Sequence, residues 1–329
     1  MSAPMRLGVI GGGAWGTALA AVAATNGPVR LWAREKEVVT DICERRENRT
    51  FLPGVALSNT IEASDDLEAL TDCDALLAVT PAQHLGRVLS AFDVGDRPLI
   101  LCSKGIEAGT RRLMTDVAAD AAPAASIAVL SGPTFASEVA RDLPTAVTFA
   151  AADEALSRTL IDRIARPTFR PYYSDDLIGA EVGGAVKNVL AIACGVAAGL
   201  ALGENARASL ISRGFAEMVR FGLALGAREE TLGGLSGLGD LVLTCSSTAS
   251  RNMSFGKALG EGANATGLLQ DRKTVAEGAH TVPVLADMAR DMGVDMPIVE
   301  TVEGLVAGRF HARDALGRLL SRPLRGETG

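Results

Sequence analysis

Lys187 is the residue whose surroundings first suggest chemistry. It stands near the start of an apolar stretch, Gly183 to Gly203, that carries no charged or amide side chain between Asn188 and its end. A helix that is apolar on every side is expected to be buried, and small residues let its neighbours approach closely. A lysine there must pair with an acid, reach water, or act in proton transfer with a lowered pKa. The stretch therefore predicts a buried helix with Lys187 at the edge of a core.

Two alternatives for this stretch remain open. The long side chain of Lys187 could pass the core and reach solvent. The stretch could also cross a membrane, but its uncharged part after Asn188 is about 15 residues long, whereas a span needs roughly 20. We therefore expect no membrane span.

A glycine motif near the N-terminus suggests a second kind of chemistry. An apolar run over residues 6–10 leads into GGGAWG at 11–16 and then into a helical pattern of small residues. This order of strand, loop and helix is the context in which G-x-G-x-x-G binds a dinucleotide. Gly11 permits the tight turn, Gly13 lets the backbone approach a pyrophosphate, and Gly16 lets the helix pack on the strand. The alternative is a glycine turn without a ligand.

Arg34 bears on which dinucleotide binds. It follows the expected second strand, Val29 to Trp32. NAD-selective proteins usually carry an acid near this point that binds the ribose 2′-hydroxyl, whereas an arginine suits a 2′-phosphate. The sequence therefore favours NADPH, although Glu35 keeps NADH open and a solvated arginine is the simpler alternative.

Further short apolar runs, separated by helical intervals, predict a mainly parallel sheet with crossover helices. They cover residues 75–79, 99–101, 127–130 and 146–149. Ligands bind outside the carboxyl ends of such strands, so the polar segments after the first three runs should gather with the glycine loop around one crevice. Lys104 is the notable charge among them, unless it is only a surface residue.

Beyond about residue 174 the pattern changes to long helical periods. Apolar residues from 210 to 222 recur at three- and four-residue steps, while Arg213, Glu217 and Arg220 fall on the opposite face. The second half of the chain is therefore expected to be helical.

Polar groups gather again between residues 233 and 252. Asp240 follows a glycine-rich turn and could simply cap the next helix, or it could pair with a lysine or accept a substrate hydroxyl. Arg251 and Asn252 place a guanidinium beside an amide, which suits a phosphate or a carboxylate.

Length and composition limit the remaining possibilities. The 329 residues exceed what one core usually serves, so we expect two domains: a dinucleotide-binding Rossmann-like α/β domain over 1–180 and an all-helical substrate-binding domain over 181–329. A net charge of −7 disfavours nucleic acid as a partner. Five cysteines without a C-x-x-C pair suggest neither disulfides nor a metal site. These features, and an N-terminus without an apolar signal core, fit a cytoplasmic protein.

Eight segments together resemble the bacterial-type NAD(P)-dependent sn-glycerol-3-phosphate dehydrogenases over nearly the whole chain. The segments are GGGAWGTA at 11–18, NRTFLPG at 48–54, SKGIE at 103–107, SGPTFA at 131–136, EVGGAVKNV at 181–189, GLGDLVLTC at 237–245, SRN at 250–252 and EG at 277–278. Phe51 stands where tyrosine is more frequent, and Thr134 where serine is common. The resemblance implies reversible hydride transfer between NAD(P)H and dihydroxyacetone phosphate, giving sn-glycerol 3-phosphate for glycerophospholipid synthesis in a cytoplasmic homodimer.

The resemblance also implies roles for individual residues. Lys187 would transfer the proton at the C2 oxygen of the substrate, with Lys104 and Asp240 completing the catalytic group. Substrate contacts are implied for Lys104, Gly132, Thr134, Lys187, Asn188, Asp240, Ser250, Arg251 and Asn252. Besides Gly11, Gly13 and Gly16, cofactor contacts are implied for Ala14, Trp15, Arg34, Lys104, Ala136, Arg251, Val275 and Glu277.

Two other classes of protein compete with this interpretation. A ketopantoate reductase or 3-hydroxyacid dehydrogenase would share the two-domain plan and a lysine on a central helix, but we would not expect Gly-Leu-Gly-Asp-Leu followed by Ser-Arg-Asn in it. A nucleotide sensor would bind NADPH without turnover, and the polar groups beyond the cofactor site argue against it.

Overall fold

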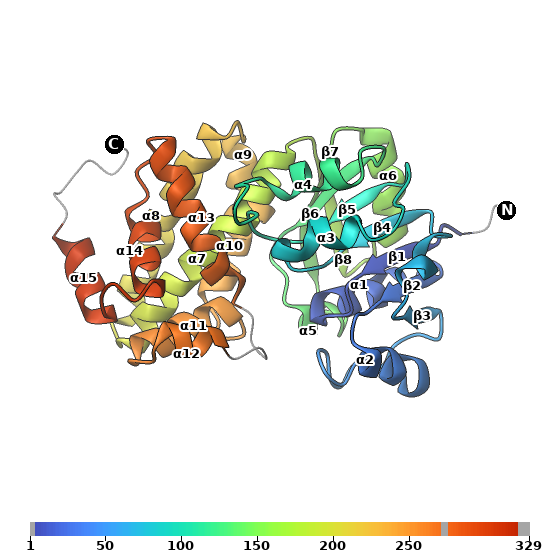
Figure 1. The fold of residues 1–329 in the computed structure, drawn as a ribbon, viewed down its shortest axis with the longest axis horizontal. Coiled ribbons are helices and arrows are strands. Elements are labelled where there is room, and N and C mark those ends of the chain that lie inside the picture. The colour runs from blue at the N-terminus through green and yellow to red at the C-terminus, as the bar shows by residue number, and fades with distance from the viewer. Residues whose placement is uncertain (1–3, 271–275, 322–329) are drawn as a thin grey trace.

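The computed structural model describes residues 4–270 and 276–321. Figure 1 shows two lobes side by side, one built around a sheet and the other entirely of helices. The strands are β1 (Leu7–Ile10), β2 (Val29–Trp32), β3 (Ile61–Ser64), β4 (Ala75–Ala78), β5 (Leu99–Leu101), β6 (Ile127–Ser131), β7 (Thr145–Ala151) and β8 (Phe169–Ser174).

The helices of the sheet lobe alternate with its strands, and those of the second lobe follow one another. In the sheet lobe they are α1 (Ala14–Ala23), α2 (Lys36–Thr40), η1 (Asp41–Arg45), η2 (Leu67–Leu70), η3 (Ala82–His84), α3 (Leu85–Leu89), α4 (Met114–Ala121), α5 (Ala136–Val139) and α6 (Glu154–Ile164). In the helical lobe they are α7 (Leu177–Gly199), α8 (Gly203–Ala224), α9 (Glu229–Leu232), η4 (Leu235–Gly239), α10 (Asp240–Cys245), α11 (Arg251–Gly260), α12 (Ala265–Gln270), α13 (Glu277–Asp291), α14 (Pro297–Val306) and α15 (Ala312–Leu320).

The eight strands form one sheet in the order β3-β2-β1-β4-β5-β6-β7-β8. All neighbouring strands are parallel except β6 and β7. The central strands β1, β4 and β5 are wholly buried, as expected for strands covered on both faces. The predicted fold class, a Rossmann-like mainly parallel sheet domain followed by a helical domain, is confirmed.

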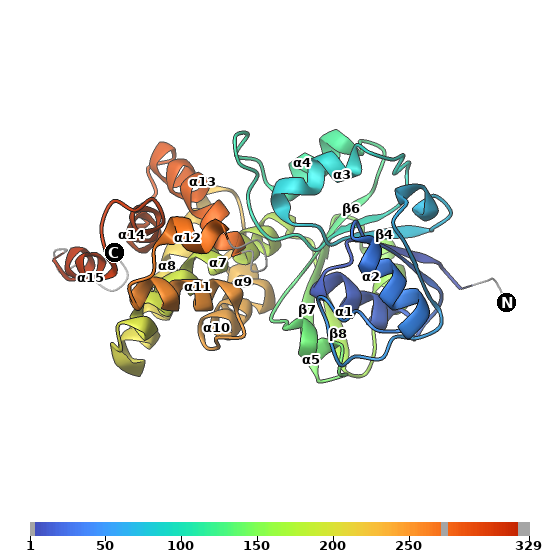
Figure 2. The same ribbon diagram turned by 60° about the horizontal axis from the view of Figure 1, so that its bottom comes forward.

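Helices cover both faces of the sheet. Figure 2 shows α3 and α4 on one face and α1 with α5 on the other. The two apolar cores agree with this picture, since one contains Leu85 and Met114 and the other contains Leu19 and Val139. The sheet is thus the middle layer of three, and its strand ends remain available at the edges.

Helix α7 forms the centre of the second lobe and is buried from Gly179 to Ala197. It begins at Leu177, where the Asp176 carboxylate accepts the backbone N–H of Gly179 at 2.8 Å. Lys187 therefore lies in the middle of a helix, and its expected place near the start of a helix is wrong. The predicted buried helix is confirmed, and the predicted domain boundary at residue 180 stays a prediction.

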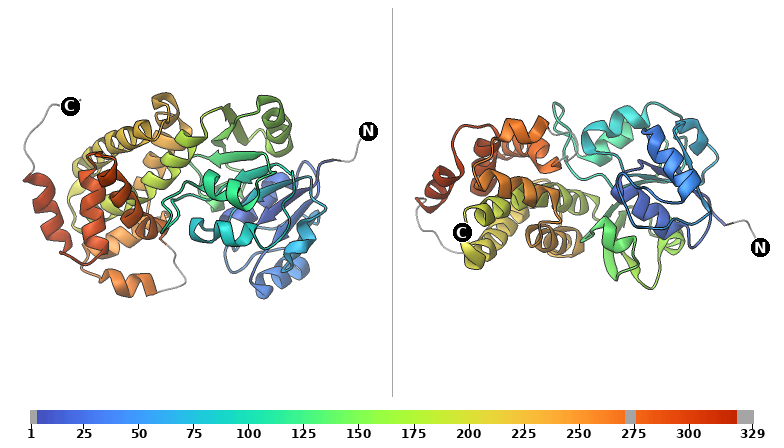
Figure 3. Two further views of the ribbon diagram at one scale, coloured as in Figure 1. Left: turned by 45° about the horizontal axis from the view of Figure 1, so that its top comes forward. Right: turned by 90° about the horizontal axis from the view of Figure 1, so that it is seen from below.

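The apolar character of α7 is explained by its neighbours. Within the described ranges, α7 is the one helix that is long and apolar enough to cross a membrane, but 89% of the qualifying window is buried inside the protein. The two further views in Figure 3 show other helices packed around it on several sides. Protein therefore already covers the surface that a bilayer would contact.

Glycines let α7 and α11 cross almost backbone to backbone. A Cβ atom at Gly195 would lie 2.1 Å from the carbonyl oxygen of Met253, and one at Gly256 would lie 2.1 Å from that of Ile192. No carbon atom fits at such distances, so the small residues of this stretch are required by packing.

Glu217 departs from the sequence expectation. It was expected on the polar face of α8, but it is 1% exposed and accepts the N–H groups of Ile298 at 2.7 Å and Val299 at 3.2 Å. These N–H groups belong to the first turn of α14, and Met296 at its N-cap has no side-chain oxygen to accept them. Burial raises the pKa of Glu217 to about 8, while the two N–H groups lower it. A periodic pattern cannot distinguish such a cap from a solvated acid.

The crossing of α7 and α11 provides a stability prediction. Gly195→Ala should lower the free energy of unfolding by about 1–3 kcal/mol, because the two backbones would have to separate. Gly267→Ala is the matched control, since a Cβ atom there meets nothing within 4 Å and α12 should gain helix propensity. Urea unfolding of both variants measures the difference. Equal stability of the two variants would contradict the packing argument.

Candidate active site

The carboxyl ends of five adjacent strands form one edge of the sheet. Arg34 follows β2, Gly11 follows β1, Thr80 follows β4, Lys104 follows β5 and Gly132 follows β6. These strands are parallel and consecutive in the sheet, so the segments after them lie along the same edge. The structure thus brings the glycine loop and the three polar segments together as predicted.

The glycine loop has the geometry that a pyrophosphate requires. Gly11 has a φ of +125°, and a Cβ atom at Gly16 would lie 1.9 Å from the carbonyl oxygen of Gly11. Gly13, by contrast, faces open space. In the described part of the chain no side chain caps the start of α1, so its first N–H groups are available to an anion. The loop therefore fits the diphosphate of a dinucleotide.

Asn48 holds this loop, which the sequence did not reveal. Its side chain is buried and donates to the carbonyl oxygen of Gly12 at 2.8 Å and to Oγ1 of Thr17 at 2.7 Å. Its carboxamide oxygen accepts the N–H of Phe51 at 3.0 Å. The available signal was its place in the NRTFLPG segment, which contributes to the family resemblance.

The centre of the site is a carboxylate shared by two lysines. Lys187 Nζ lies 2.7 Å from Oδ1 of Asp240, and Lys104 Nζ lies 2.5 Å from Oδ2. Lys104 also donates to the carbonyl oxygen of Gly132 at 3.2 Å, and Lys187 donates to Oγ1 of Thr244 at 2.9 Å. Asp240 begins α10, but its side chain binds the lysines. The sequence expectation that it pairs with a lysine is met, while Thr244 was missed.

The surroundings lower the pKa of Lys187 from 10.5 to about 8. Burial is the largest cause, because it disfavours the charged ammonium; Asp240 raises the pKa, and Lys104 lowers it. The result is a buried amine that can exchange a proton near neutral pH.

Two glycines on α7 allow this centre to form. A Cβ atom at Gly183 would lie 2.3 Å from the carbonyl oxygen of Ser236 in η4, the turn that leads into Asp240. At Gly184 it would lie 3.2 Å from Cγ of Lys104. The absence of side chains at both positions lets two separate segments approach Lys187.

A second polar group joins three helices. Asn252 on α11 donates to the carboxamide oxygen of Asn188 on α7 at 2.9 Å and accepts the N–H of Gly278 on α13 at 2.9 Å. Ser250 caps α11 by accepting the N–H of Met253 at 3.3 Å. Arg251 is exposed at the first position of that helix. Among the three predicted phosphate ligands, Arg251 therefore has the side chain most available to an anion.

Glu277 begins α13 and directly precedes Gly278, whose N–H binds Asn252. Burial raises the pKa of its carboxyl group, whereas Arg251, Lys187 and Lys104 lower it. Of the other predicted cofactor contacts, Ala14, Trp15 and Ala136 pack against one apolar core. Val275 lies outside the described residues.

Arg34 is already engaged by its neighbour. Its side chain is 71% exposed and contacts Oε1 of Glu35 through Nε at 3.0 Å and Nη2 at 2.6 Å. A 2′-phosphate would have to compete with this carboxylate for the guanidinium group. Glu35 itself could accept a ribose hydroxyl, so the pair suits either cofactor.

Three buried hydroxyls near the two lysines and the glycine loop lack hydrogen-bond partners in the described part of the chain. Among residues 4–270 and 276–321, Thr80, Ser131 and Ser236 have buried hydroxyl oxygens without a hydrogen-bond partner. Thr80 and Ser131 lie at the carboxyl ends of β4 and β6, and Ser236 lies beside Gly183. Buried polar atoms are normally satisfied, so these hydroxyls fit a polar ligand at this edge.

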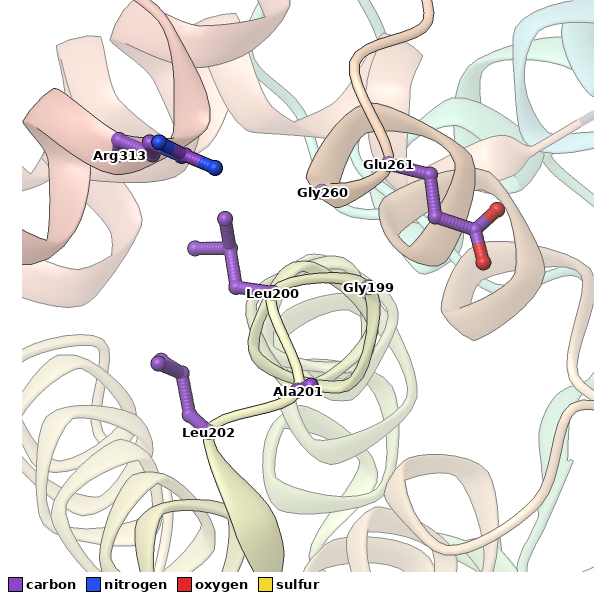
Figure 4. Close-up of a pocket in the computed structure, with 7 residues that line it drawn as sticks. All are labelled: Gly199, Leu200, Ala201, Leu202, Gly260, Glu261 and Arg313. Atoms are coloured by element: carbon purple, nitrogen blue, oxygen red, sulfur yellow. The ribbon is translucent and has the colours of Figure 1, made fainter.

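A separate open pocket lies at the far end of α7. Its volume is about 600 Å³, and Figure 4 shows Leu200, Leu202 and Arg313 at its rim. Gly199 in this pocket is twelve residues from Lys187, which corresponds to about 18 Å along a helix. The pocket is therefore separate from the site formed by Lys187, Lys104 and Asp240.

A diphosphate site at the edge of a parallel sheet, together with a buried amine of lowered pKa on a second domain, is typical of dehydrogenases that use a nicotinamide dinucleotide. The family models for the N-terminus and C-terminus of NAD-dependent glycerol-3-phosphate dehydrogenase match residues 6–157 and 176–317. The chain belongs to this family, which confirms the resemblance found in the sequence and decides against a ketopantoate reductase or a 3-hydroxyacid dehydrogenase.

Individual relatives agree over nearly the whole chain. The chain is 65% identical to the NAD(P)+ glycerol-3-phosphate dehydrogenase of Novosphingobium aromaticivorans, with 98% of each chain covered. The crystal structure of glycerol-3-phosphate dehydrogenase from Coxiella burnetii matches with a TM-score of 0.92 at 38% identity, covering 97% of this chain and 99% of that one. The enzyme from Saccharomyces cerevisiae matches with a TM-score of 0.83 at 27% identity, covering 96% and 99%. The chain is thus an NAD(P)-dependent oxidoreductase.

The Arg34–Glu35 pair predicts how cofactor choice can be changed. Arg34→Gln should weaken NADPH binding roughly 10- to 100-fold and leave NADH binding nearly unchanged, because one charge-assisted contact to the 2′-phosphate is lost. Glu35→Gln should strengthen NADPH binding by freeing the guanidinium group. Fluorescence titration with each cofactor measures these constants without turnover. If Arg34→Gln weakened NADPH binding and NADH binding equally, Arg34 would not be the residue that contacts the 2′-phosphate.

Proposed function

We propose that this chain reduces dihydroxyacetone phosphate to sn-glycerol 3-phosphate reversibly, with Lys187 as the proton donor at the C2 oxygen. The observation that carries the proposal is the pairing of Lys187 and Lys104 with the single carboxylate of Asp240. The 65% identical relative from Novosphingobium aromaticivorans is a glycerol-3-phosphate dehydrogenase, which supports the same substrate.

The reaction needs positive charge and a proton at one oxygen atom. The glycine loop would hold the diphosphate of the dinucleotide, and the reduced nicotinamide at its other end would supply the hydride for the C2 carbonyl carbon. Lys187 then stabilises the negative charge that develops on the C2 oxygen and transfers its proton there. Asp240 keeps Lys187 in place and protonated, and Lys104 adds a second positive charge beside it. In the reverse direction a neutral Lys187 accepts the proton from the C2 hydroxyl.

The phosphate end of the substrate is assigned to the start of α11. The N-terminus of a helix attracts anions through its N–H groups and dipole. Arg251 at this position adds a guanidinium group that can bind a phosphate with two hydrogen bonds. Asn188 and Asn252 hold this helix end against α7, and Ser250 caps it, so they support the site together with Gly132 and Thr134 from the sheet lobe.

We further propose that the enzyme operates as a homodimer in the cytoplasm and supplies sn-glycerol 3-phosphate to glycerophospholipid synthesis, as the family resemblance implies. We propose a preference for NADPH, because Arg34 can leave Glu35 to bind the 2′-phosphate, while Glu35 still lets NADH bind through its ribose hydroxyl.

The direct test is oxidation of NADPH, and separately of NADH, in the presence of dihydroxyacetone phosphate, followed by absorbance at neutral pH. Unphosphorylated dihydroxyacetone is the control, since it lacks the group assigned to Arg251. We expect rapid oxidation with the phosphorylated substrate and little without it. Binding of NADPH without any oxidation would contradict the proposal and favour a nucleotide sensor.

In the same assay Lys187→Ala should lower turnover by roughly 100-fold or more and leave cofactor binding nearly unchanged. Lys257→Ala is the matched control, because that lysine is half-buried on α11 and pairs with Glu261. Near-normal turnover in Lys187→Ala would remove this residue from the mechanism.

A further inference from the structure

Glu181 is a buried acid of α7 that the proposed mechanism does not use. Its side chain accepts the backbone N–H of Thr115 at 2.9 Å and the Thr115 hydroxyl at 2.6 Å. Thr115 is the second residue of α4, and Leu113 at the N-cap of α4 has no side-chain oxygen to accept this N–H. Burial raises the pKa of Glu181 to about 7, and the bonds from Thr115 lower it. A residue of the helical lobe thus caps a helix of the sheet lobe.

The position of Glu181 along α7 connects it with Lys104. Glu181 and Gly184 are three residues apart, so they lie on one face of α7 about one turn from each other. Gly184 is the residue against which the Lys104 stem packs, since a Cβ atom there would lie 3.2 Å from Cγ of Lys104. The segment 104–115 therefore contacts adjacent turns of the same helix at its two ends.

The middle of this segment also contacts the helical lobe. Arg111 pairs with Asp291 and, at 3.8 Å, with Asp287, both on α13. Figure 2 shows the chain between β5 and α4 extending from the sheet lobe to the helices. From the sheet lobe, Gln83 donates to the carbonyl oxygen of Ile106 at 2.8 Å and accepts the N–H of Ala108 at 2.9 Å. The segment is covalently part of the sheet lobe, and the helical lobe holds it at both ends and at Arg111.

We propose that Glu181 is a positioning residue for Lys104. By fixing segment 104–115 to α7, it holds Lys104 at the position along this helix where its amine, like that of Lys187, reaches the carboxylate of Asp240. Both lysines are then positioned by one rigid helix, although they belong to different domains. The consequence for substrate binding rests on the proposed function, in which Lys104 contacts dihydroxyacetone phosphate.

Glu181→Ala should therefore change substrate kinetics as well as stability. We expect kcat/KM for dihydroxyacetone phosphate to fall roughly 5- to 50-fold, because small displacements of a catalytic group are costly. The NADPH dissociation constant should stay within about threefold, because Lys104 is one of many implied cofactor contacts and the glycine loop, formed by β1 and α1, is unchanged. Amide hydrogen exchange in segment 104–115 should become faster, and this readout does not require turnover.

Glu217→Ala is the matched control. Glu217 is also a buried acid that accepts N–H groups at the start of another helix, but it joins α8 to α14 within the helical lobe. It should lower the melting temperature as Glu181→Ala does and leave substrate kinetics and exchange in segment 104–115 unchanged. Glu181→Gln keeps an acceptor for the Thr115 N–H, so it should restore kcat/KM to within about threefold.

Thr115→Val provides the test if Glu181→Ala does not fold. It removes the hydrogen bond from the Thr115 hydroxyl to Glu181 with little change of shape. It should lower kcat/KM and speed amide exchange in segment 104–115, both to a smaller degree than Glu181→Ala. The proposal is overturned if folded Glu181→Ala or Thr115→Val has wild-type kcat/KM and wild-type exchange in segment 104–115. It is also overturned if Glu181→Gln regains the melting temperature without regaining kcat/KM. A wild-type protein inactive on dihydroxyacetone phosphate would contradict the proposed function, and hydrogen exchange would still decide the role of Glu181.

Discussion

Asp240 accepts hydrogen bonds from Lys187 and Lys104 at once, and the rest of the site depends on this arrangement. A buried ammonium group without a partner would lose its proton, because desolvation penalises the charged form. One carboxylate shared by two cations compensates part of that penalty and leaves net positive charge. The position is therefore favourable for an oxygen atom that becomes negative during a reaction.

Helix α7 gives this arrangement its geometry. It carries Lys187 directly, and its glycines admit η4, which leads into Asp240, and the stem of Lys104. Farther along, the same helix packs against α11, whose first residue is Arg251. Residues from both lobes thus meet on one rigid element, so the separation between the charged groups does not depend on flexible loops alone.

Several parts of the site could be predicted from the sequence because local patterns encode them. The glycine loop combines a strand, a turn and a helix over a few residues, and the continuous apolar run around Lys187 indicated burial correctly. The family resemblance implied that Lys104 and Asp240 belong to one site. Their hydrogen bond could be found only in the folded structure, because the two residues are far apart in the sequence.

Other features could not be predicted because they depend on tertiary contacts. Glu217 follows the pattern of a solvated face, yet the N-terminus of α14 happens to need its carboxylate. The edge strands β3 and β8 were missed, since each has one free edge and lacks a continuous apolar run. Thr244 and Asn48 are ordinary polar residues in sequence. Only the structure shows that Thr244 accepts a hydrogen bond from Lys187 and that Asn48 donates one to the glycine loop.

The most direct test of the central claim is the pH dependence of kcat/KM for dihydroxyacetone phosphate reduction between pH 7 and 10, measured for the wild type and Asp240→Asn. A pKa of about 8 for Lys187 means that the reducing activity is full below that pH and declines as Lys187 loses its proton above it. Asp240 raises this pKa, so the decline should move to lower pH in Asp240→Asn. An activity that stays constant up to pH 10, or a decline at the same pH in both proteins, would contradict the account.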